Sequence, residues 1–380
     1  MAMASPDFPS RTATAGLTWR RLAAALLRKD AVTAAAWDRL NAARCNLPFL
    51  SAYAMVAALD AFGDGREELF VASRNAVPVA MFLLVRQGRL SWQTFQPSQI
   101  PLGSWVAEPA LDLDGLVDGL LHGPLGLALT LTVTQVDPLM APRAADAPWC
   151  EHADYIETAW IDVAGPFDAY WSARGKNLRQ NLRKQRNKLA AKSVRTTLRL
   201  LREVQEMKPA LVRYGVLESL GWKAGYGTAI HADNVQGCFY VALLEAAARR
   251  GEAVVCEYLF DDRTVAMNLC LRRSGTCTVL KTTYDETVEL FSPASLLREE
   301  ELQTFFADGT TRIEYFGRLM EWHSKLTDAK RTLYHMTAYR WPVVKMIARM
   351  RRRNATEALL PAAAAGAPDR VPAAPADANA

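Results

Sequence analysis

The sequence predicts a mixed α/β fold in which two copies of one unit each form a central, mainly antiparallel sheet flanked by helices. Three observations support this prediction. Segments 252–260, 264–273 and 276–284 have the composition of strands and are joined by the short turns DDR and SG, which is typical of an antiparallel meander. Helical segments precede and follow this meander. A similar stretch also occurs earlier in the chain.

Length and composition agree with such a fold. A chain of 380 residues is long enough for about two domains. Hydrophobic residues make up 50% and charged residues 22%, which excludes a disordered or fibrous protein. The 6 cysteines form no CxxC pair, so we expect reduced thiols in a cytoplasmic protein, and neither a disulfide framework nor a zinc site.

The two ends of the chain differ in composition from the rest. We expect residues 1–16 to be a disordered tail, and 343–380 to be a basic helix followed by an Ala/Pro-rich disordered tail. The apolar run LAAALL near the N-terminus is too short for a signal peptide or a membrane span, which favours a cytoplasmic location. The folded units are expected at 17–160 and 161–342.

An internal repeat supports the two-unit architecture. The residues Val79, Ala80, Met81, Leu83 and Arg86 recur 186 positions later as Val265, Ala266, Met267, Leu269 and Arg272. In the first copy, 67–73 is then the preceding strand and 112–123 the following helix. We therefore interpret the chain as a duplication.

The helices beside the meander have recognisable ends. Segment 237–251 has helical spacing and stops at a glycine. After the meander, Ser292 is the expected N-cap and Pro293 the first helical residue. A further strand is expected at 311–317.

Segment 170–189 predicts an amphipathic helix with a strongly basic side. Its apolar positions are Trp171, Leu178, Leu182 and Leu189, whereas Lys176, Arg179, Arg183 and Arg186 share a separate face. This face either binds an anion, such as a nucleic acid, a phospholipid headgroup or the phosphates of a cofactor, or is simply solvated. Nucleic acid is the less favoured partner, because no RNA- or DNA-binding motif accompanies the charge.

Four motifs in order connect these elements to a known family. They are the basic helix, Gly221-Trp222-Lys223 with Gly227-Thr228-Ala229, LKTTYDE at 280–286 and SPASLL at 292–297. From about residue 160 to 330 the chain resembles the GNAT-type acyltransferase domain of the bacterial cellulose-biosynthesis acetyltransferases (the CelD/BcsL family), relatives of the Fem-type aminoacyl transferases. Segment 46–59 resembles the opening of the same family, in which Fem-type relatives contain tandem GNAT folds.

The resemblance implies transfer of an acyl group from acetyl-CoA or another acyl-CoA to an amine or hydroxyl. The expected acceptor is a small molecule or saccharide precursor of exopolysaccharide or cell-envelope assembly, such as cellulose biosynthesis. Peripheral association with a membrane polysaccharide-synthesis complex is the partner interaction that this pathway implies. No metal is expected to take part, and motifs of serine hydrolases, metal sites and phosphate-binding loops do not occur in the sequence.

In the resembled family, a backbone N–H of the strand at 276–284 polarises the acyl carbonyl. Lys281 and Tyr284 lie three positions apart near the end of this strand, so they point to opposite faces of the sheet. Tyr284 is our candidate acid or binding group, with packing at the strand end as the alternative. Lys281 is a candidate contact to the donor.

The donor's phosphates are expected at the N-terminus of the helix that begins near Ser292, where unpaired N–H groups and the helix dipole favour anions. The candidate contacts are Ser292, Ser295, Arg179 and Arg183. The family's Gln/Arg-x-x-Gly-x-Gly/Ala loop is missing, and Asp285, Glu286 and Glu289 place negative charge before the helix. Ser292 is expected to cap the helix in either case.

The glycine-flanked pair Trp222 and Lys223 is our candidate wall for the acceptor, because the glycines permit close approach of a ligand. In the alternative, Trp222 anchors the loop in the core and Lys223 is solvated. His231 follows directly as a further binding candidate. Glu218, one helical turn before Trp222, is a candidate general base or the partner of Lys223 in a surface ion pair.

His323 is the other candidate base, because histidine titrates near neutrality. It lies near a position where the family commonly carries Tyr-Lys, a pattern that is altered here, and His231 competes with it for this role. Two alternative functions remain open. One is a Fem-type transferase that uses aminoacyl-tRNA and holds RNA phosphates on the basic helix. The other is a catalytically silent GNAT-like scaffold that uses 343–353 as a basic amphipathic membrane contact.

Overall fold

The computed structural model describes residues 16–220 and 230–359. In its first half, an edge strand is followed by helices, a meander, one more helix and one more strand. These elements are β1 (Thr18–Ala23), α1 (Leu26–Lys29), α2 (Ala31–Arg44), η1 (Pro48–Leu50), α3 (Ala52–Phe62), β2 (Glu68–Arg74), β3 (Val77–Gly88), β4 (Ser91–Thr94), β5 (Trp105–Ala107), α4 (Leu113–His122) and β6 (Thr130–Val136). The side chains of Asp30 and Asp112 accept backbone N–H bonds and so cap α2 and α4.

The second half repeats this succession after a long connecting strand. Its elements are β7 (Cys150–Asp162), α5 (Phe167–Ser172), α6 (Lys176–Ala191), β8 (Thr196–Leu201), α7 (Val204–Leu220), α8 (Val235–Ala248), β9 (Ala253–Phe260), β10 (Arg263–Arg273), β11 (Thr276–Tyr284), η3 (Glu286–Phe291), α9 (Pro293–Ala307), β12 (Arg312–Glu314), α10 (Glu321–Ser324), β13 (Lys330–Tyr339) and α11 (Pro342–Leu359). The predicted meander and its flanking helices are confirmed. The predicted single helix at 170–189 is wrong, because Gly175 adopts a non-helical conformation and separates α5 from α6.

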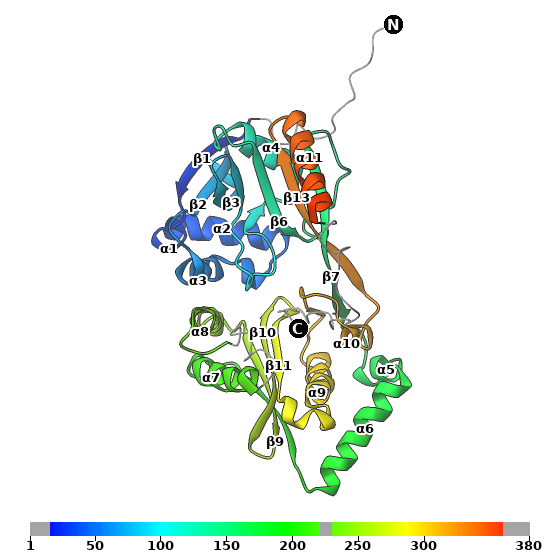
Figure 1. Ribbon diagram of the computed structural model, residues 1–380. Helices are drawn as coiled ribbons and strands as arrows, with labels where there is room; N and C mark the ends of the chain where they lie inside the picture. Colours follow the sequence, from blue (N-terminus) through cyan, green and yellow to red (C-terminus); the bar gives the residue numbers. More distant parts are fainter. Residues whose placement is uncertain (1–15, 221–229, 360–380) are drawn as a thin grey trace.

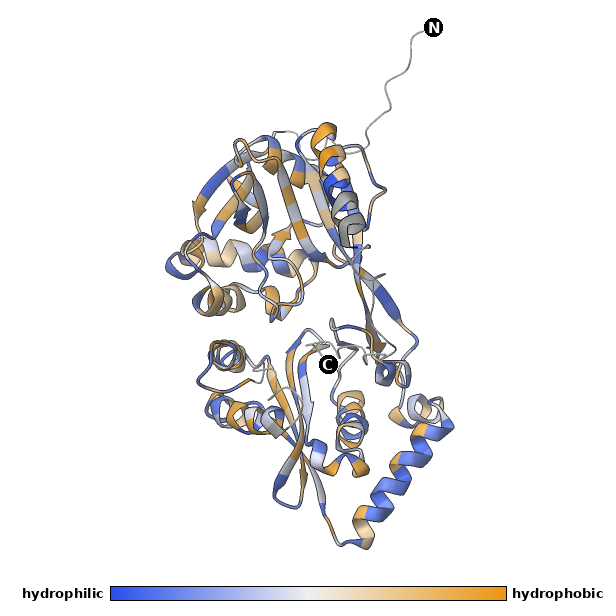
Figure 2. Cartoon of the chain, viewed as in Figure 1, coloured by the Kyte–Doolittle hydropathy of each residue, from blue (hydrophilic) through white to orange (hydrophobic). Residues whose placement is uncertain are grey.

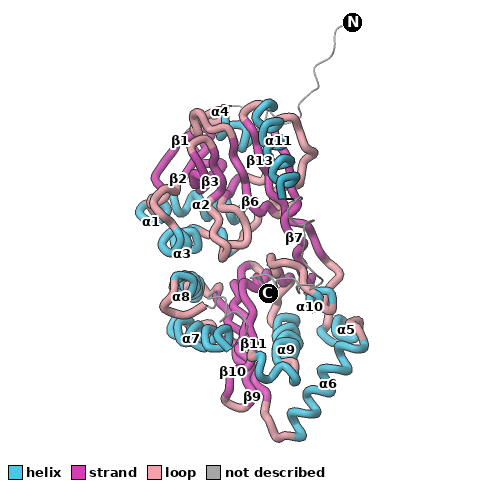
Figure 3. Tube along the Cα trace, in the orientation of Figure 1, coloured by secondary structure: helices cyan, strands magenta, loops and turns pink. Residues whose placement is uncertain are grey.

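The strands form one 13-stranded sheet that continues through both halves (Figures 1 and 3). The order is β1-β2-β3-β4-β6-β13-β7-β12-β11-β10-β9-β8, and β5 pairs with β3. Counted inwards from the two edges of the sheet, β1-β2-β3-β4-β6 in the first half corresponds to β8-β9-β10-β11-β12 in the second. The parallel pairs, β4 with β6 and β11 with β12, also occupy equivalent places, and the other pairs are antiparallel. The predicted mixed α/β fold with a mainly antiparallel sheet is therefore confirmed, and the repeated order supports the duplication.

Strands β7 and β13 join the two halves. Although β13 belongs to the second half in sequence, it pairs with β6 of the first half as well as with β7. Strand β7 in turn pairs with β13 along most of its length and with β12 at its end. The buried Arg331 of β13 donates hydrogen bonds to Asp137, which follows β6, and to Glu314 of β12. One strand within the predicted unit 161–342 thus completes the sheet of the other unit.

The apolar core does not divide between the two units. One buried cluster includes residues of both halves, and α3 packs against α8 within it, with the ring centroids of Phe62 and Phe239 5.2 Å apart. A second cluster lies between the second half of the sheet and the helices α6 and α9. Figure 2 shows the corresponding hydrophobic residues on the strands and on the helix faces that cover them.

The repeated residues lie in the core. Val79 to Met81 and Leu83 of β3 are buried, as are Val265 to Met267 and Leu269 of β10. The 6 cysteines all lie in the described ranges and are free thiols. The tails predicted at the two ends lie outside the described residues, apart from the helix α11, which matches the basic helix expected after residue 342.

Candidate functional site

Strands β11 and β12 separate in the second half of the sheet. They pair only from Thr276 to Thr278, opposite Arg312 to Glu314, and β11 then continues alone on this side to Tyr284. Among the described residues, no other strand pairs with this edge beyond Thr278. An unpaired strand edge exposes backbone N–H and C=O groups. The separation therefore creates a gap along the edge of β11, with which no strand of the described residues pairs beyond Thr278.

A β-bulge lies in the same part of β11. Leu269 of β10 faces Lys281, but the next residue, Cys270, faces Val279, so Leu280 is an extra residue in β11. A bulge bends its strand and changes the direction of the side chains around it. The sequence predicts that Lys281 and Tyr284 face opposite sides of the sheet. In agreement with this, the two residues line different cavities.

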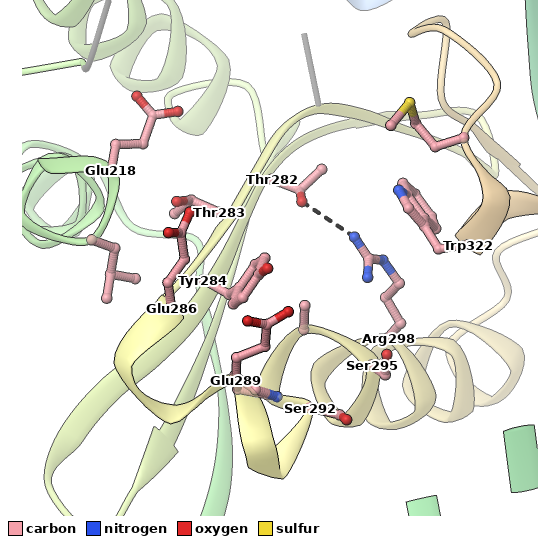
Figure 4. Close-up of a pocket in the computed structure, with 14 residues that line it drawn as sticks. Glu218, Thr282, Thr283, Tyr284, Glu286, Glu289, Ser292, Ser295, Arg298 and Trp322 are labelled. Carbon is pink, nitrogen blue, oxygen red and sulfur yellow. Dashed lines mark hydrogen bonds between the residues drawn. The ribbon is translucent and has the colours of Figure 1, made fainter. Parts of the chain in front are cut away.

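Two cavities flank the gap. The helix-side cavity, of about 370 Å³, is formed by the end of β11, the start of α9 and part of α7, and is shown in Figure 4. The interface cavity, of about 110 Å³, is lined by residues of both halves, including Gln99, Gln135 and Tyr155. Both cavities are lined by Thr282, Met320 and Trp322, which therefore form the boundary between them.

A third hollow, the groove, lies between α6 and α9. Its volume is about 630 Å³, and the first turns of both helices line it. It shares Ser292, Ser295, Arg298 and Trp322 with the helix-side cavity, so the two hollows are neighbours. Neither α6 nor α9 has a side-chain N-cap hydrogen bond, although both helices begin beside this groove.

Arg298 occupies the boundary between the helix-side cavity and the groove. Its Nη2 donates to Oγ1 of Thr282 at 3.3 Å, and its guanidinium carbon lies 3.7 Å from the centroid of the Trp322 ring (Figure 4). Burial lowers the pKa of this guanidinium. Among the described residues, Arg298 forms no ion pair with a carboxylate. A partly buried cation without a carboxylate is suited to an anionic ligand.

The electrostatic character of the two neighbouring hollows differs. Among the described residues, the helix-side cavity is lined by three carboxylates, Glu218, Glu286 and Glu289, and by one cation, Arg298. The groove is lined by the cations Arg174, Arg298 and Lys325 and by one acid, Asp328. An anion is therefore more stable in the groove than in the helix-side cavity.

The acidic residues that place negative charge before α9 have different roles in the structure. Asp285 is fully buried, accepts from Arg263 and caps η3 through Thr287, so it does not line the hollow. Glu286 and Glu289 do line the helix-side cavity. The predicted capping role of Ser292 is wrong: this residue has φ 52° and ψ 52°, and its side chain makes no cap bond. A side-chain cap requires an extended backbone at that position.

Residues 176–324 match the family model described as "Acetyltransferase (GNAT) domain". The chain carries a GNAT acyltransferase domain. No curated protein sequence matches the chain. Similar solved structures include the C-terminal domain of a putative lysylphosphatidylglycerol synthetase from Agrobacterium fabrum, at 14% identity over 77% of this chain and 90% of that chain, with a TM-score of 0.48.

Two further similar structures are FemX, at 10% identity over 74% of this chain and 90% of that chain with a TM-score of 0.47, and a tandem GNAT protein from the clavulanic acid biosynthesis pathway. The latter is 14% identical over 85% of this chain and 98% of that chain, with a TM-score of 0.44. The segment matched to the GNAT model contains the separated strands β11 and β12 and both helices beside the groove. The gap and the helix-side cavity thus lie within the matched segment, whereas residues outside it also line the interface cavity and the groove. The matched domain is that of an acyltransferase.

Tyr284 and Glu218 both line the helix-side cavity of the GNAT domain (Figure 4). Burial, followed by the charges of Glu289 and Glu286, raises the pKa of Tyr284, so its hydroxyl keeps its proton at neutral pH. Glu218 is buried and accepts from the N–H of Ile230 at 2.8 Å and from the hydroxyl of Tyr214 at 3.3 Å. The alternative of a surface ion pair does not fit this burial, because α7 turns the side chain inwards, whereas Lys223 lies outside the described residues.

His323 and Lys281 line the interface cavity, on the other side of the gap. The imidazole of His323 is buried, stacks on Trp322 and accepts at Nδ1 from the N–H of Met320 at 2.9 Å. Burial and the charge of Arg298 lower the pKa of His323 to about 3. A general base near neutral pH needs a higher pKa and a free acceptor nitrogen, so this geometry argues against the predicted catalytic role. His323 instead positions Met320 and Trp322.

The basic helix α6 contributes less to the site than the sequence predicts. Arg179 donates to the carbonyl of Arg174, and Arg183 is exposed outside both cavities and the groove. Arg186, predicted to share their free face, forms ion pairs with Glu299 and Glu300 of α9. The apolar side is as predicted, with Leu182 and Leu189 buried.

Two of the three residues predicted to bind the acceptor, Trp222 and Lys223, lie outside the described residues. His231 is exposed and is 3.4 Å from the hydroxyl of Ser219, and it does not line the cavities beside the gap. Sequence reasoning missed Arg298, Thr282 and Trp322. Arg298 lies on the second turn of α9, beyond Ser292 and Ser295, and this helical spacing is the signal that indicates it.

A separate cluster in the first half brings Asp114, Cys150 and His152 together, with their potential ligand atoms within 4.8 Å of one another. Nε2 of His152 lies 3.8 Å from Asp114, and Nδ1 lies 3.3 Å from Asp146. Both ring nitrogens thus face carboxylates, which explains the buried imidazole without a metal. The cluster lies near α4 and β7, away from the gap (Figure 1).

Proposed function

We propose that the GNAT domain transfers an acyl group from an acyl-CoA to an amine or hydroxyl of a small polar acceptor. The separation of β11 from β12 beyond Thr278 carries this proposal. Backbone N–H groups on this edge of β11, which no described strand pairs, are positioned as donors for the oxygen of a thioester carbonyl, which becomes more negative during acyl transfer. The cavities on either side of the gap allow donor and acceptor to approach from opposite directions.

The groove suits the phosphates of the donor. Its cations Arg174, Arg298 and Lys325 outnumber its single carboxylate, and the start of α9 adds a helix dipole that favours anions. Arg174 and Lys325 already contact the carbonyl of Leu326 and the carboxylate of Glu321. Arg298 is therefore the principal phosphate contact in this proposal. Ser292 and Ser295 add hydroxyl donors beside it.

The reaction requires two proton transfers in opposite directions. The acceptor's nitrogen or oxygen forms a bond to the acyl carbon and loses a proton, while the C–S bond breaks and the thiolate of CoA gains a proton. Tyr284 supplies the second proton, because its raised pKa keeps the hydroxyl protonated and it lines the helix-side cavity. Glu218 lies on the same cavity, and in this proposal it takes the first proton.

The interface cavity is the entry for the acceptor. Residues of the first half and of β7 line it together with β11, so the first half takes part in recognising the acceptor. Gln135 and Phe316, with φ of 45° and 49°, line it in left-handed backbone conformations, a strain that is typical of functional sites. On the resemblance alone, we propose a saccharide or cell-envelope precursor as acceptor, exopolysaccharide assembly as the pathway and the cytoplasm as the location.

Transfer from an aminoacyl-tRNA is the second candidate function. The observation that favours it is the exposed basic side of α6, which includes Arg183, Lys184 and Lys188 beside a shallow surface hollow. Phosphate contacts of RNA on this face would weaken steeply with salt. Binding of CoA thioesters in the groove depends on Arg298 instead, so the two candidates predict different residues.

The test is a thermal-shift titration of the full chain with acetyl-CoA, longer acyl-CoAs, free CoA and tRNA. A ligand that binds only the native state stabilises it by about 2.7 kcal/mol at a hundred times its Kd. We expect the CoA compounds to raise the Tm, and the acyl-CoA of the preferred chain length to raise it most. No shift with any CoA compound, together with a salt-sensitive shift with tRNA, would favour the second candidate.

A further inference from the structure

The helix α11 exposes its apolar side to solvent. Val343, Met346, Ile347 and Met350 are 50%, 50%, 44% and 55% exposed. Their spacing of three, four and seven positions places them within about 100° of one another on a helix. We call these four residues the α11 stripe. A surface helix of a globular protein normally turns such a stripe towards the core.

The side of α11 that contacts the protein is polar instead. Nζ of the buried Lys345 donates to the carbonyls of Ala147 and Cys150. Arg349 and Arg352 both pair with Glu151 of β7. The helix is thus attached through cations and hydrogen bonds. Its polar side faces the protein and its apolar side faces solvent. Figure 2 shows hydrophobic and hydrophilic residues alternating along this helix, at the edge of the first half.

The exposed apolar surface continues beyond the helix. Trp341, directly before α11, is 52% exposed, and Leu127 is 81% exposed. The two segments that carry them are joined, because the guanidinium of Arg340, next to Trp341, donates to the carbonyls of Gly126 and Ala128 on either side of Leu127. Exposed apolar side chains on neighbouring segments are typical of an interaction site.

The charge of the helix indicates what covers this surface. Between residues 342 and 356 the sequence contains Lys345 and four arginines but no acidic residue. Arg351 is exposed and lies on the edge of the α11 stripe at 100° per residue. Apolar residues bordered by cations, with an aromatic ring at one end, are typical of a helix that lies in the interface of an anionic membrane. Among the described residues, no helix has the length and hydrophobicity needed to cross a bilayer.

We propose that α11, together with Trp341 and Leu127, binds the surface of an anionic phospholipid membrane, with the α11 stripe in the acyl–headgroup boundary. The exposed Arg351, at the edge of the stripe, then lies at the level of the negatively charged headgroups. This proposal does not depend on the proposed acyl transfer, because α11 lies beside the first half of the sheet and the gap lies in its second half (Figure 1). Bound in this way, the enzyme would meet acceptors that are themselves attached to a membrane.

The test is co-sedimentation of the full chain with vesicles of phosphatidylcholine alone and with vesicles of about three parts phosphatidylcholine to one part phosphatidylglycerol. The variant is Met346→Glu with Ile347→Glu, which changes only exposed side chains. The control is Val32→Glu on α2, an equally apolar residue that is 76% exposed. Thermal unfolding of all three proteins verifies that each is folded.

We expect the native chain and the control to bind the anionic vesicles, and the variant to bind at least tenfold more weakly. Neutral vesicles and added salt should both reduce binding. The proposal is overturned by absence of binding to anionic vesicles, or by equal binding of variant and native chain. It is also overturned if light scattering shows a native dimer that the variant abolishes, because a second copy then covers the stripe.

Discussion

The guanidinium of Arg298 lies against the indole of Trp322, with 3.7 Å between the guanidinium carbon and the ring centroid. Arg298 comes from α9, and Trp322 from the segment that follows β12, so the pair spans the opening between β11 and β12. Both residues line the helix-side cavity and the groove. A cation held over an aromatic ring is partly desolvated, which strengthens its attraction for a phosphate.

Replacing Arg298 with methionine should weaken binding of acyl-CoA by roughly 10- to 100-fold, because a charge-assisted hydrogen bond contributes about 1.5–3 kcal/mol. Stability should change little, since the variant removes a buried cation that has no carboxylate partner. Calorimetric titration with acetyl-CoA measures the effect. Arg183→Met, which removes the same charge from an exposed position on α6, is the matched control and should leave affinity unchanged.

Replacing Tyr284 with phenylalanine should lower kcat by about 100-fold with little change in KM, if its hydroxyl protonates the leaving thiolate. The pKa of this hydroxyl is raised, mainly by burial, so the native rate should not decline through loss of its proton below about pH 10. Release of free CoA thiol, followed from pH 6 to 10, measures both. Tyr339→Phe on β13 controls for loss of a hydroxyl elsewhere. An unchanged kcat in Tyr284→Phe would exclude the acid role.

Replacing Glu301 with glutamine should stabilise the protein at high pH. Burial raises the pKa of this carboxyl from 4.5 to about 7, although Asn268 donates to it. The folded state therefore binds a proton more tightly than the unfolded state, and stability is lost as the pH rises from about 4.5 to 7. The variant should avoid this loss, so that it exceeds the native chain by up to about 3 kcal/mol at pH 8 and by almost nothing at pH 4.

Urea unfolding of both chains at the two pH values measures the difference. Glu245→Gln on the surface of α8 is the control and should show no such pH dependence. Equal stability of Glu301→Gln and the native chain at pH 8 would contradict the raised pKa.

Replacing Arg331 with methionine should destabilise the protein by about 3–5 kcal/mol, because it leaves the buried carboxylates of Asp137 and Glu314 without their cation. Lys330→Met is the control on the same strand. Its exposed ion pair with Glu157 contributes at most about 1 kcal/mol. Adding Asp137→Asn and Glu314→Gln to the Arg331 variant should restore part of the loss. If Arg331→Met and Lys330→Met both lower the free energy of unfolding by a similar, small amount, the contacts of Arg331 do not hold the halves together.

The sequence predicted the elements that depend on local patterns. The bounds of the strand 276–284 and the start of α9 at Pro293 agree with the structure, because turn residues and a proline at the first helical position act within a few residues. The repeat between β3 and β10 was visible because equivalent core positions retain the same apolar residues. Tyr284 was identified for a related reason, since its position at the end of a strand is a local property.

Features that depend on long-range contacts could not be predicted in this way. Arg298 and Trp322 are 24 positions apart and meet only because α9 and the chain after β12 fold back to the same gap. The pairing of β13 with the first half has no local signature either, because strand composition does not specify a partner. The sequence favoured His323 as a base because it does not reveal that the imidazole is buried. This burial lowers the pKa of His323.

The central claim is that the gap beside β11 holds the acyl group. A crystal structure of the protein with an acyl-CoA analogue in which a methylene group replaces the thioester sulfur tests it most directly. We predict the carbonyl oxygen within about 3.2 Å of a backbone nitrogen in 279–282, with phosphates beside Arg298. An analogue bound elsewhere, with the pair of Arg298 and Trp322 unchanged, would contradict the claim.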